Sequence, residues 1–322
     1  MITQIDASRI SVLRFAAATL VSLGALGMSG AQAQQAYPSR PIEYIVPWGP
    51  GGGADQVARK TAQLMQGDLK ASLPVINVPG ATGQTGLNKM LTAPADGYTM
   101  SVMTGDTFGL LTDPNTKWKL DDLVCAAVMI KQPSAFFTAA DNLKTWADVM
   151  REAKTRPLKV AITGFGSPDD MHVNYFAGKG LKLVSVPFAK PAERYTAIIG
   201  GHADILYEQL GDVKSFLQSN KMRPVLIFAE QRFPAFKDIP VGKELGYDIV
   251  INQFRGVMMR AGTDPKQVKV ISDALAKAAA SDDYKKYLAD QYADANSFVP
   301  AEKARAFLEN ELQSMRKFAI KK

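Results

Sequence analysis

The sequence predicts an α/β protein of about two domains, and three observations lead to this expectation. The chain has 322 residues, which is long for a single core. Apolar residues make up 47% of it and charged residues 21%, an ordinary globular balance. Short apolar runs alternate with stretches of helical periodicity, which is typical of strands joined by helices in mostly parallel sheets.

The first 33 residues have the organisation of a secretory signal peptide. Arg9 and Arg14 are basic, Phe15–Met28 is apolar, and Ala31-Gln32-Ala33 fits the small-residue cleavage pattern. A membrane anchor is the alternative, but the apolar run is short for a span. We therefore expect export to the periplasm and exclude residues 1–33 from the fold.

The mature chain reads as a succession of strands and helices without a low-complexity linker. Strands are expected at Tyr44–Val46, Val75–Val78, Thr99–Met103, Cys125–Ile130, Ala135–Ala139, Lys159–Ile162, Leu183–Pro187, Ile205–Tyr207, Pro224–Phe228 and Gly256–Arg260. Helices are expected at Ala54–Ala71, Thr85–Ala93, Thr145–Thr155, Asp169–Lys179, Ala192–Gly200, Asp212–Ser219, Pro265–Ala280, Asp283–Gln291 and Ala301–Ala319.

The two domains are expected to share the chain discontinuously. Because three helices follow the strand at Gly256–Arg260 without a break, the chain should return to the first domain there. We expect residues 34–132 and 254–322 to form the first domain and residues 133–253 the second.

A glycine-rich turn, Trp48–Asp55, follows the first strand and leads into the first helix. Backbone N–H groups at a helix N-terminus lack intrahelical partners and lie at the positive end of the helix dipole, so such a turn favours an anion. The turn also fits a dinucleotide pattern, but no strand ending in an acidic residue follows at the required spacing. A tight turn without a ligand is the remaining alternative.

Two further strand ends support the interpretation of a ligand site. Pro79–Gly86 is a second glycine loop that leads into a helix, and Thr104–Thr107 follows the third strand with small polar residues. In open α/β sheets, loops at successive strand ends converge on one crevice. We therefore expect this second loop and the polar residues Thr104, Asp106 and Thr107 to line the same cleft as the first loop.

The middle region offers a second wall. Ser167 is expected to cap a helix that continues with Pro168 and carries Asp170 in its first turn. Glu208 ends an apolar strand, where a carboxylate is unfavourable unless it is solvated, paired or used. Lys190 or Arg194 could pair with Glu208, so a cap and a salt bridge without further function remain the alternatives.

Several classes of function are disfavoured by the sequence. The net charge of +7 is scattered without interleaved aromatic residues, so nucleic acid is not expected. His172 and His202 stand on separate segments, which makes a histidine metal site implausible, and Cys125 is the only cysteine. Enzyme signatures are mostly missing, and we expect neither a cofactor nor a metal.

The chain resembles the Bug family, the solute receptors of tripartite tricarboxylate transporters. The similarity runs through the whole mature chain in family order. It is carried by Tyr37-Pro38-Ser39-Arg40-Pro41-Ile42, Ile45-Val46-Pro47-Trp48 with the glycine loop, Val78-Pro79-Gly80-Ala81-Thr82-Gly83, Ala95-Asp96-Gly97-Tyr98-Thr99, Gly166-Ser167-Pro168, Val186-Pro187-Phe188, Gly200-Gly201-His202-Ala203-Asp204 and Ala261-Gly262-Thr263.

The resemblance implies a two-domain periplasmic-binding-protein fold of type 2, with a hinge, that closes over a small carboxylate like a Venus flytrap. It also implies a monomeric, non-enzymatic protein that passes its solute to membrane transporter subunits. With the residue analysis, it places ligand-binding roles on Trp48, Gly51, Gly52, Gly53, Ala54, Asp55, Ala81, Thr82, Gly83, Thr104, Asp106, Thr107, Ser167, Asp170, Lys190 and Glu208.

The sequence departs from the family pattern on the second wall. The family often has His at the place of Asp170, Asp-Asn at the place of Glu208-Gln209, and Tyr-Lys-Gly at the place of Phe188-Ala189-Lys190. The ligand's carboxylate is expected on the first wall, with a hydroxyl, amide, amine or aromatic edge at its far end. Two other functions stay open: a secreted enzyme with Glu208 and Asp170 as acid and base, and a signalling receptor.

We predict cleavage after Ala33, because basic, apolar and small residues follow one another in the order of a signal peptide. Intact-mass measurement of the protein recovered from the periplasm should give a chain that begins at Gln34. A recovered chain that keeps Phe15–Met28 would contradict export by cleavage.

Overall fold

The computed structural model describes residues 36–319. The expected signal peptide, residues 1–33, lies outside the described residues. Within the described range, no helix has both the length and the apolar character needed to cross a bilayer.

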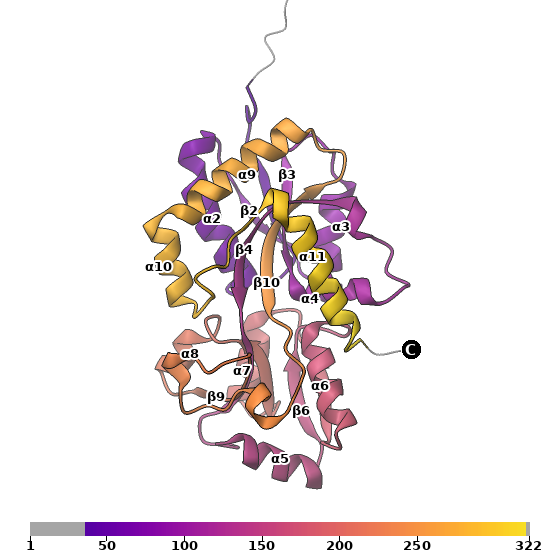
Figure 1. Cartoon of the computed structure of the whole chain (residues 1–322), viewed down its shortest axis with the longest axis vertical. Helices are drawn as coiled ribbons and strands as arrows, with labels where there is room; N and C mark the ends of the chain where they lie inside the picture. The colour runs from indigo at the N-terminus through magenta and orange to yellow at the C-terminus, as the bar shows by residue number, and fades with distance from the viewer. Residues whose placement is uncertain (1–35, 320–322) are drawn as a thin grey trace, which may run out of the picture. The chain divides into compact units, whose positions relative to one another are not determined.

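Six strands form one sheet, called sheet A, in the order β11-β4-β10-β3-β1-β2. β1 (Glu43–Val46) pairs in parallel with β2 (Val75–Asn77) and β3 (Thr99–Thr104). β10 (Gln253–Arg260) runs antiparallel to β3 and to β4 (Leu123–Gln132), and β11 (Val299–Pro300) runs antiparallel to β4. β4 and β10 lie side by side (Figure 1).

Five strands form a second sheet, called sheet B, in the order β7-β6-β8-β5-β9. β6 (Leu158–Ile162) pairs in parallel with β7 (Leu183–Pro187) and β8 (Ile205–Gln209). β5 (Ser134–Ala139) runs antiparallel to β8 and to β9 (Met222–Phe228). The ten predicted strands are therefore present, and the two-residue β11 is an addition.

The expectation of mostly parallel sheets is wrong. Five of the nine strand pairs are antiparallel. The physical reason is the route of the chain: β4 leaves sheet A and is followed across Pro133 by β5 of sheet B, while β10 brings the chain back. A strand that leaves a sheet and one that returns to it along the same path must run in opposite directions. The predicted domain limits stay a prediction.

The nine predicted helices are present, with ends displaced by a few residues. They are α2 (Gly53–Leu69), α3 (Gln84–Thr92), α5 (Trp146–Thr155), α6 (Pro168–Gly178), α7 (Pro191–Ile199), α8 (Lys214–Gln218), α9 (Pro265–Ala280), α10 (Asp282–Asp290) and α11 (Ala301–Arg316). The short helix α4 (Gly105–Gly109) was missed, because a helix of five residues that begins and ends with glycine carries no periodicity.

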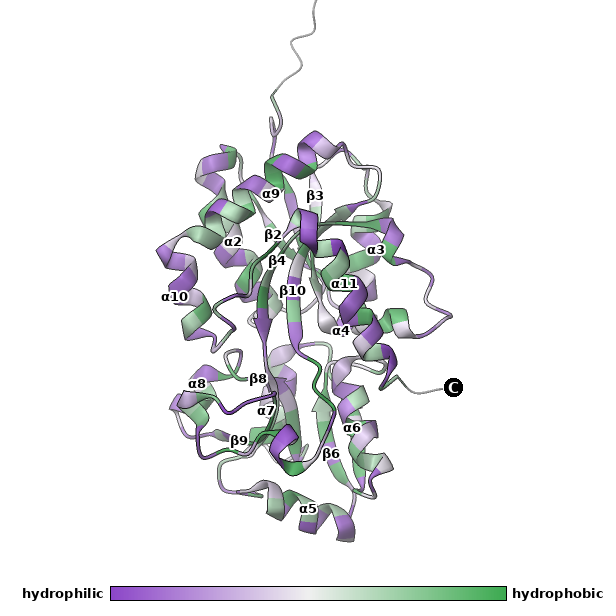
Figure 2. Ribbon diagram, in the orientation of Figure 1, coloured by the Kyte–Doolittle hydropathy of each residue, from purple (hydrophilic) through white to green (hydrophobic). Residues whose placement is uncertain are grey.

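Helices cover both faces of sheet A. α2 and α9 share one apolar cluster with the sheet, and α3 and α11 share another on the opposite face. The predicted stripe of α2 is confirmed, since Ala54, Ala58, Ala62, Met65 and Leu69 are all buried. Bands of hydrophobic and hydrophilic residues alternate along these helices (Figure 2), as expected for helices with one buried side. This packing holds the N-terminus of α2 in a fixed place at the end of β1.

Candidate functional site

The glycine turn before α2 is shaped by Asp55. The N–H of Gly51, which has a φ of 84°, donates to Oδ2 of Asp55 at 3.0 Å. The same carboxylate accepts from Arg59 and, at 3.0 Å, from Asn77. Although burial opposes ionisation, these hydrogen bonds from Arg59, Gly51 and Asn77 lower the pKa of Asp55. Asp55 therefore fixes the loop by bonding back onto it.

The second glycine loop packs on the end of β3. Ala81, Thr82 and Gly83 all have positive φ angles, between 47° and 85°. A Cβ at Gly83 would overlap Oγ1 of Thr107, so only glycine allows this close approach. On its other side, Thr82 lies against Gly164, which follows β6 of sheet B. This loop is thus a contact between the two halves of the molecule, and Ala81 is exposed.

The end of β3 joins the first loop through Trp48. Nε1 of Trp48 donates to Oγ1 of Thr104 at 3.2 Å, and the same hydroxyl oxygen accepts from the N–H of Thr107 at 3.3 Å. Asp106, in α4, accepts from Nε2 of Gln253 at 2.7 Å. The ends of β1 and β3 are therefore joined by side-chain contacts, and the loop after β2 packs on Thr107 through Gly83.

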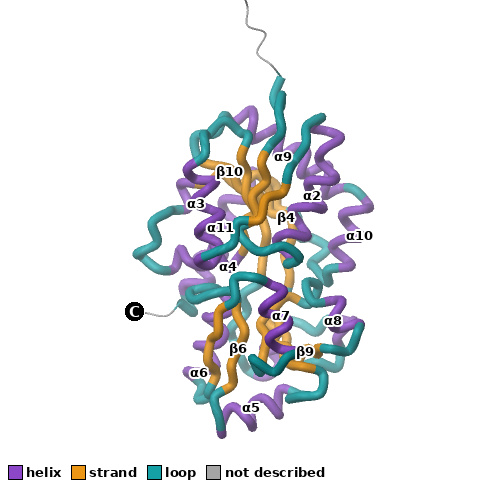
Figure 3. The backbone as a smooth tube through the Cα atoms, turned by 180° about the vertical axis from the view of Figure 1, so that it is seen from behind, coloured by secondary structure: helices purple, strands orange, loops and turns teal. Residues whose placement is uncertain are grey.

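A small cavity of about 20 Å³ lies where the loops of the two sheets meet. In Figure 3, α7 begins among the loops between the strands of the two sheets. Six of the predicted site residues line this cavity: Trp48, Gly53, Ala54, Thr104, Asp106 and Glu208. The lining also includes Thr163, Pro191, Arg194, Gln209, Asp212 and Arg255. A cavity of this size holds about one water molecule.

Glu208 is paired with Arg194 and not with Lys190. Nη2 of Arg194 donates to Oε2 of Glu208, and both side chains are 4% exposed. Lys190 instead pairs with Glu193 at 2.9 Å on the surface. The charge of Glu208 is therefore compensated within the sheet B half, and the side chain of Lys190 lies outside the cavity.

Ser167 and Asp170 serve mainly to begin α6. Oγ of Ser167 accepts from the N–H of Asp170 at 3.4 Å and donates to the carbonyl of Gly164 at 2.7 Å. Asp170 accepts from the N–H of Gly166 at 3.0 Å and from the hydroxyl of Ser185 at 2.7 Å. Ser167 is confirmed as the cap. Asp170 lies in the first turn, as expected, and accepts from the N–H of Gly166 and not from that of the cap residue.

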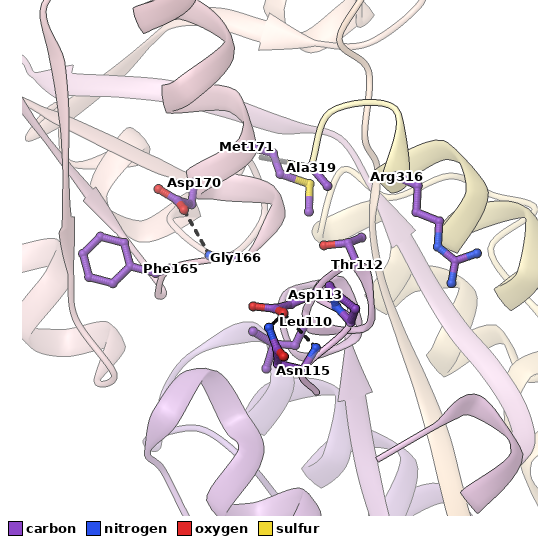
Figure 4. Close-up of a pocket in the computed structure, with 11 residues that line it drawn as sticks. Leu110, Thr112, Asp113, Asn115, Phe165, Gly166, Asp170, Met171, Arg316 and Ala319 are labelled. Carbon is purple, nitrogen blue, oxygen red and sulfur yellow. Dashed lines mark hydrogen bonds between the residues drawn. The ribbon is translucent and has the colours of Figure 1, made fainter. Parts of the chain in front are cut away.

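A larger cavity of about 730 Å³ lies beside α6 (Figure 4). It is lined by Leu110, Thr112, Asp113, Pro114, Asn115, Phe165, Gly166, Asp170, Met171, Arg316 and Ala319. Of the predicted site residues, only Asp170 belongs to it. Its carboxylate is drawn bonded to the loop at Gly166, while Arg316 comes from the end of α11.

Asp106 and Asp169 bring two carboxyls to the boundary between the halves. Oδ1 of each is buried without a hydrogen-bond partner, while Oδ2 of Asp169 accepts from the N–H and hydroxyl of Thr163 at 2.8 Å. Burial raises the pKa of Asp106. Burial, followed by the charge of Asp106, raises the pKa of Asp169 well above its usual value. Two ionised carboxylates are thus unfavourable here.

Sequence reasoning missed Arg255, Asp212 and Gln253 in the cavity region. The signal for Arg255 and Gln253 was a charged and a polar residue within the apolar strand Gln253–Arg260, where each needs a partner. Asp212 lies three residues after the end of β8, the strand that carries Glu208. Their convergence depends on the crossing of the chain between the sheets, which the sequence alone does not place.

The Asp106–Asp169 contact predicts a pH-dependent stability. Above the ordinary aspartate pKa of about 4, the unfolded chain releases protons that the folded chain retains, so this contact favours folding less as pH rises. Asp169→Asn keeps an acceptor for Thr163 and removes one of the two acids. We expect its free energy of unfolding to exceed that of the wild type at pH 7, with a smaller difference near pH 4.

Urea denaturation at a series of pH values measures this difference. Asp141→Asn, at an exposed position in another part of the sheet B half, is the matched control and should track the wild type at each pH. A difference between Asp169→Asn and wild type that does not change with pH would contradict the contact.

Because the Arg194–Glu208 pair is buried, we expect its disruption to lower the free energy of unfolding strongly. Glu208→Gln leaves the guanidinium buried without its counter-charge, and breaking such a pair destabilises by about 3–5 kcal/mol. Glu193→Gln, which breaks the exposed pair with Lys190, should change the free energy of unfolding by at most about 1 kcal/mol. Chemical denaturation at neutral pH compares the two. Equal effects would mean that Glu208 is solvated or otherwise compensated.

Comparison with known proteins shows the family of this chain. The family model described as tripartite tricarboxylate transporter family receptor matches residues 57–321. Protein BugT of Bordetella pertussis is 27% identical over 313 residues, which are 94% of this chain and 96% of BugT.

Solved structures with the same fold agree. MatC of Rhodopseudomonas palustris with bound malate is 21% identical, with a TM-score of 0.81 and coverage of 88% of this chain and 99% of MatC. The periplasmic binding protein BugD is 21% identical, with a TM-score of 0.80 and coverage of 87% and 97%. The fold is thus the two-domain α/β fold of periplasmic binding proteins, and the chain belongs to the family of tripartite tricarboxylate transporter receptors.

Proposed function

We propose that this protein is an exported receptor that captures a small organic acid between sheets A and B for a tripartite tricarboxylate-type transporter. The observation that carries the proposal is the convergence at one cavity of the first turn of α2 with the buried guanidinium of Arg255. Backbone N–H groups and a guanidinium are both suited to a carboxylate. Membership of the receptor family and the bound malate of the similar MatC protein support this ligand class.

Binding requires the two sheets to separate. A cavity of about 20 Å³ cannot hold an organic acid, whereas ligand pockets usually measure about 300–1,000 Å³. The chain passes between the sheets at Pro133 and again between Phe228 and Gln253. We propose that these two crossings act as the hinge and that closure over the solute is the signal to the membrane subunits.

The sheet B wall favours a polar but uncharged far end of the ligand. Arg194 is committed to Glu208, and Asp106, from the sheet A half, adds a further carboxyl to the same cavity. Thr163 and Gln209 offer hydrogen-bonding groups on that side. A hydroxy acid therefore fits this lining better than an acid with a second free carboxylate.

An enzyme that uses Glu208 and Asp170 together is disfavoured. Glu208 lines the small cavity and is held by Arg194, whereas Asp170 lines the larger cavity and is held by Gly166 and Ser185. An acid and a base that act on one substrate must lie within hydrogen-bonding reach of it. The protein is therefore proposed to bind without turnover.

Thermal unfolding in the presence of lactate, malate, succinate, adipate and citrate tests the proposal. A ligand at 100 times its Kd stabilises by about 2.7 kcal/mol, so at least one acid should raise the Tm clearly. Propanediol and lactamide, which lack the carboxylate, are the matched controls and should have no effect. NMR of the bound acid should show no chemical change over hours.

Two results would contradict the proposal. Equal stabilisation by the acids and by their uncharged analogues would exclude the carboxylate as the recognised group. Conversion of the acid into a product would establish an enzyme.

A further inference from the structure

Asp212 reaches from the sheet B half to Arg255 of sheet A. Nη2 of Arg255 donates to Oδ2 of Asp212 and, at 2.7 Å, to Oε1 of Gln209, while Nη1 donates to Gln132. The Arg255 side chain is 4% exposed and that of Asp212 is 1% exposed. The guanidinium thus bonds both sides of the boundary between the sheets, and Asp212 is its only ionised partner among the described residues.

The carboxylate of Asp212 also lies against the first residue of α2. A Cβ at Gly53 would overlap both carboxylate oxygens of Asp212 and Nη2 of Arg255. Gly53 begins the helix, in the turn whose N–H groups have no intrahelical partner. An internal carboxylate therefore lies beside the helix start at which the carboxylate of the ligand is expected.

The hydrogen bonding of this arrangement is incomplete. Oδ1 of Asp212 and Nε of Arg255 are both buried and have no partner. Nε is one of the donors that arginine uses in a bidentate pair with a carboxylate. Buried polar atoms without a hydrogen-bond partner are unfavourable. A carboxylate that accepted from both Nε and Nη2 of Arg255 would therefore be bound more strongly than that of Asp212.

The loop that carries Asp212 is pressed onto the sheet A half. A Cβ at Gly211 would overlap the backbone of Gln291, which follows α10. Asp212 can therefore reach Arg255 only while the two halves are close together. When the halves separate, Asp212 leaves with the sheet B half, and Arg255 and the first turn of α2 stay together on sheet A.

We propose that Asp212 is an internal competitor of the ligand: its carboxylate occupies the subsite formed by Arg255 and the first turn of α2, and a carboxylate of the solute displaces it. This inference rests on the proposed function, because it assigns the subsite of the proposed organic acid. Two carboxylates cannot share one guanidinium and one helix turn without strong repulsion. Asp212 therefore stabilises the closed arrangement that has no room for solute and lowers the apparent affinity.

The size of the effect follows from the population of that arrangement. The apparent Kd equals the intrinsic Kd divided by the fraction of binding-competent molecules. If Asp212 holds the cavity closed in nine of ten molecules, its neutralisation should tighten binding about tenfold. Asp212→Asn is suited to the test, because its amide oxygen still accepts from Arg255 and its shape is unchanged. Asp212→Ser is a second variant with a shorter side chain.

The matched control is Asp290→Asn. Asp290 pairs with Lys214 at 2.7 Å, and this pair also joins the two halves, but on the surface and away from Arg255. The Asp290→Asn substitution removes one carboxylate and one contact between the halves and leaves the subsite at Arg255 unchanged. Isothermal titration with lactate and with malate, and solution scattering without added acid, are measured for all three variants and the wild type.

We expect Asp212→Asn and Asp212→Ser to bind the recognised acid about tenfold more tightly and to show a larger radius of gyration without acid, while Asp290→Asn resembles the wild type. Weaker binding by both Asp212 variants would overturn the inference and make Asp212 a ligand contact. Equal tightening by Asp290→Asn would also overturn it, because the loss of any contact between the two halves would then be enough to tighten binding.

The scattering result separates this inference from the proposed function. If the Asp212 variants open but no acid binds to any protein, Asp212 is confirmed as the closing contact and the organic-acid function fails. If an acid binds the wild type and the Asp212 variants equally, and none of them opens, the proposed function stands and the inference is overturned.

Discussion

The antiparallel pairing of β4 with β10 is the constraint on which the arrangement of this protein depends. The chain must leave sheet A to build sheet B and must then return, and these two strands carry it in opposite directions. Gln132 lies opposite Gln253 at the end of this pair, and Arg255 lies two residues further along β10. The pairing therefore places polar side chains of sheet A at the boundary with sheet B, where a buried polar group must find a partner.

Charge compensation governs the space between the sheets. Arg194 and Arg255 bring two guanidinium groups into a region that also contains the carboxyls of Glu208, Asp212 and Asp106. Removing such charges from water is unfavourable, and their mutual attraction offsets this only when the geometry is good. The Arg194–Glu208 pair lies within one half and travels with it. The Arg255–Asp212 pair joins the halves, so its strength contributes directly to the balance between open and closed arrangements.

The glycines of the first two loops have separate physical roles. Gly51 adopts a left-handed conformation that lets the turn fold back on Asp55. Gly53 admits the close approach of Asp212 and Arg255, and Gly83 admits the hydroxyl of Thr107. A glycine-rich turn thus marks not only free N–H groups but also places where another element comes within contact of the backbone. This second role explains why only part of the first loop, and none of the second, lines the cavity.

The sequence by itself determined the order and type of the longer elements, because strands and helices are set by local periodicity. The apolar runs at Lys159–Ile162 and Leu183–Pro187 and the stripe of α2 needed no distant information. It also located the loops at the ends of β1, β2 and β3. Only the tertiary structure decided which cation compensates Glu208, that Asp170 lines a different cavity, and that Asp212 meets Arg255 at Gly53. These contacts join residues far apart in the chain, and their geometry is set by the two crossings between the sheets, for which no local pattern exists.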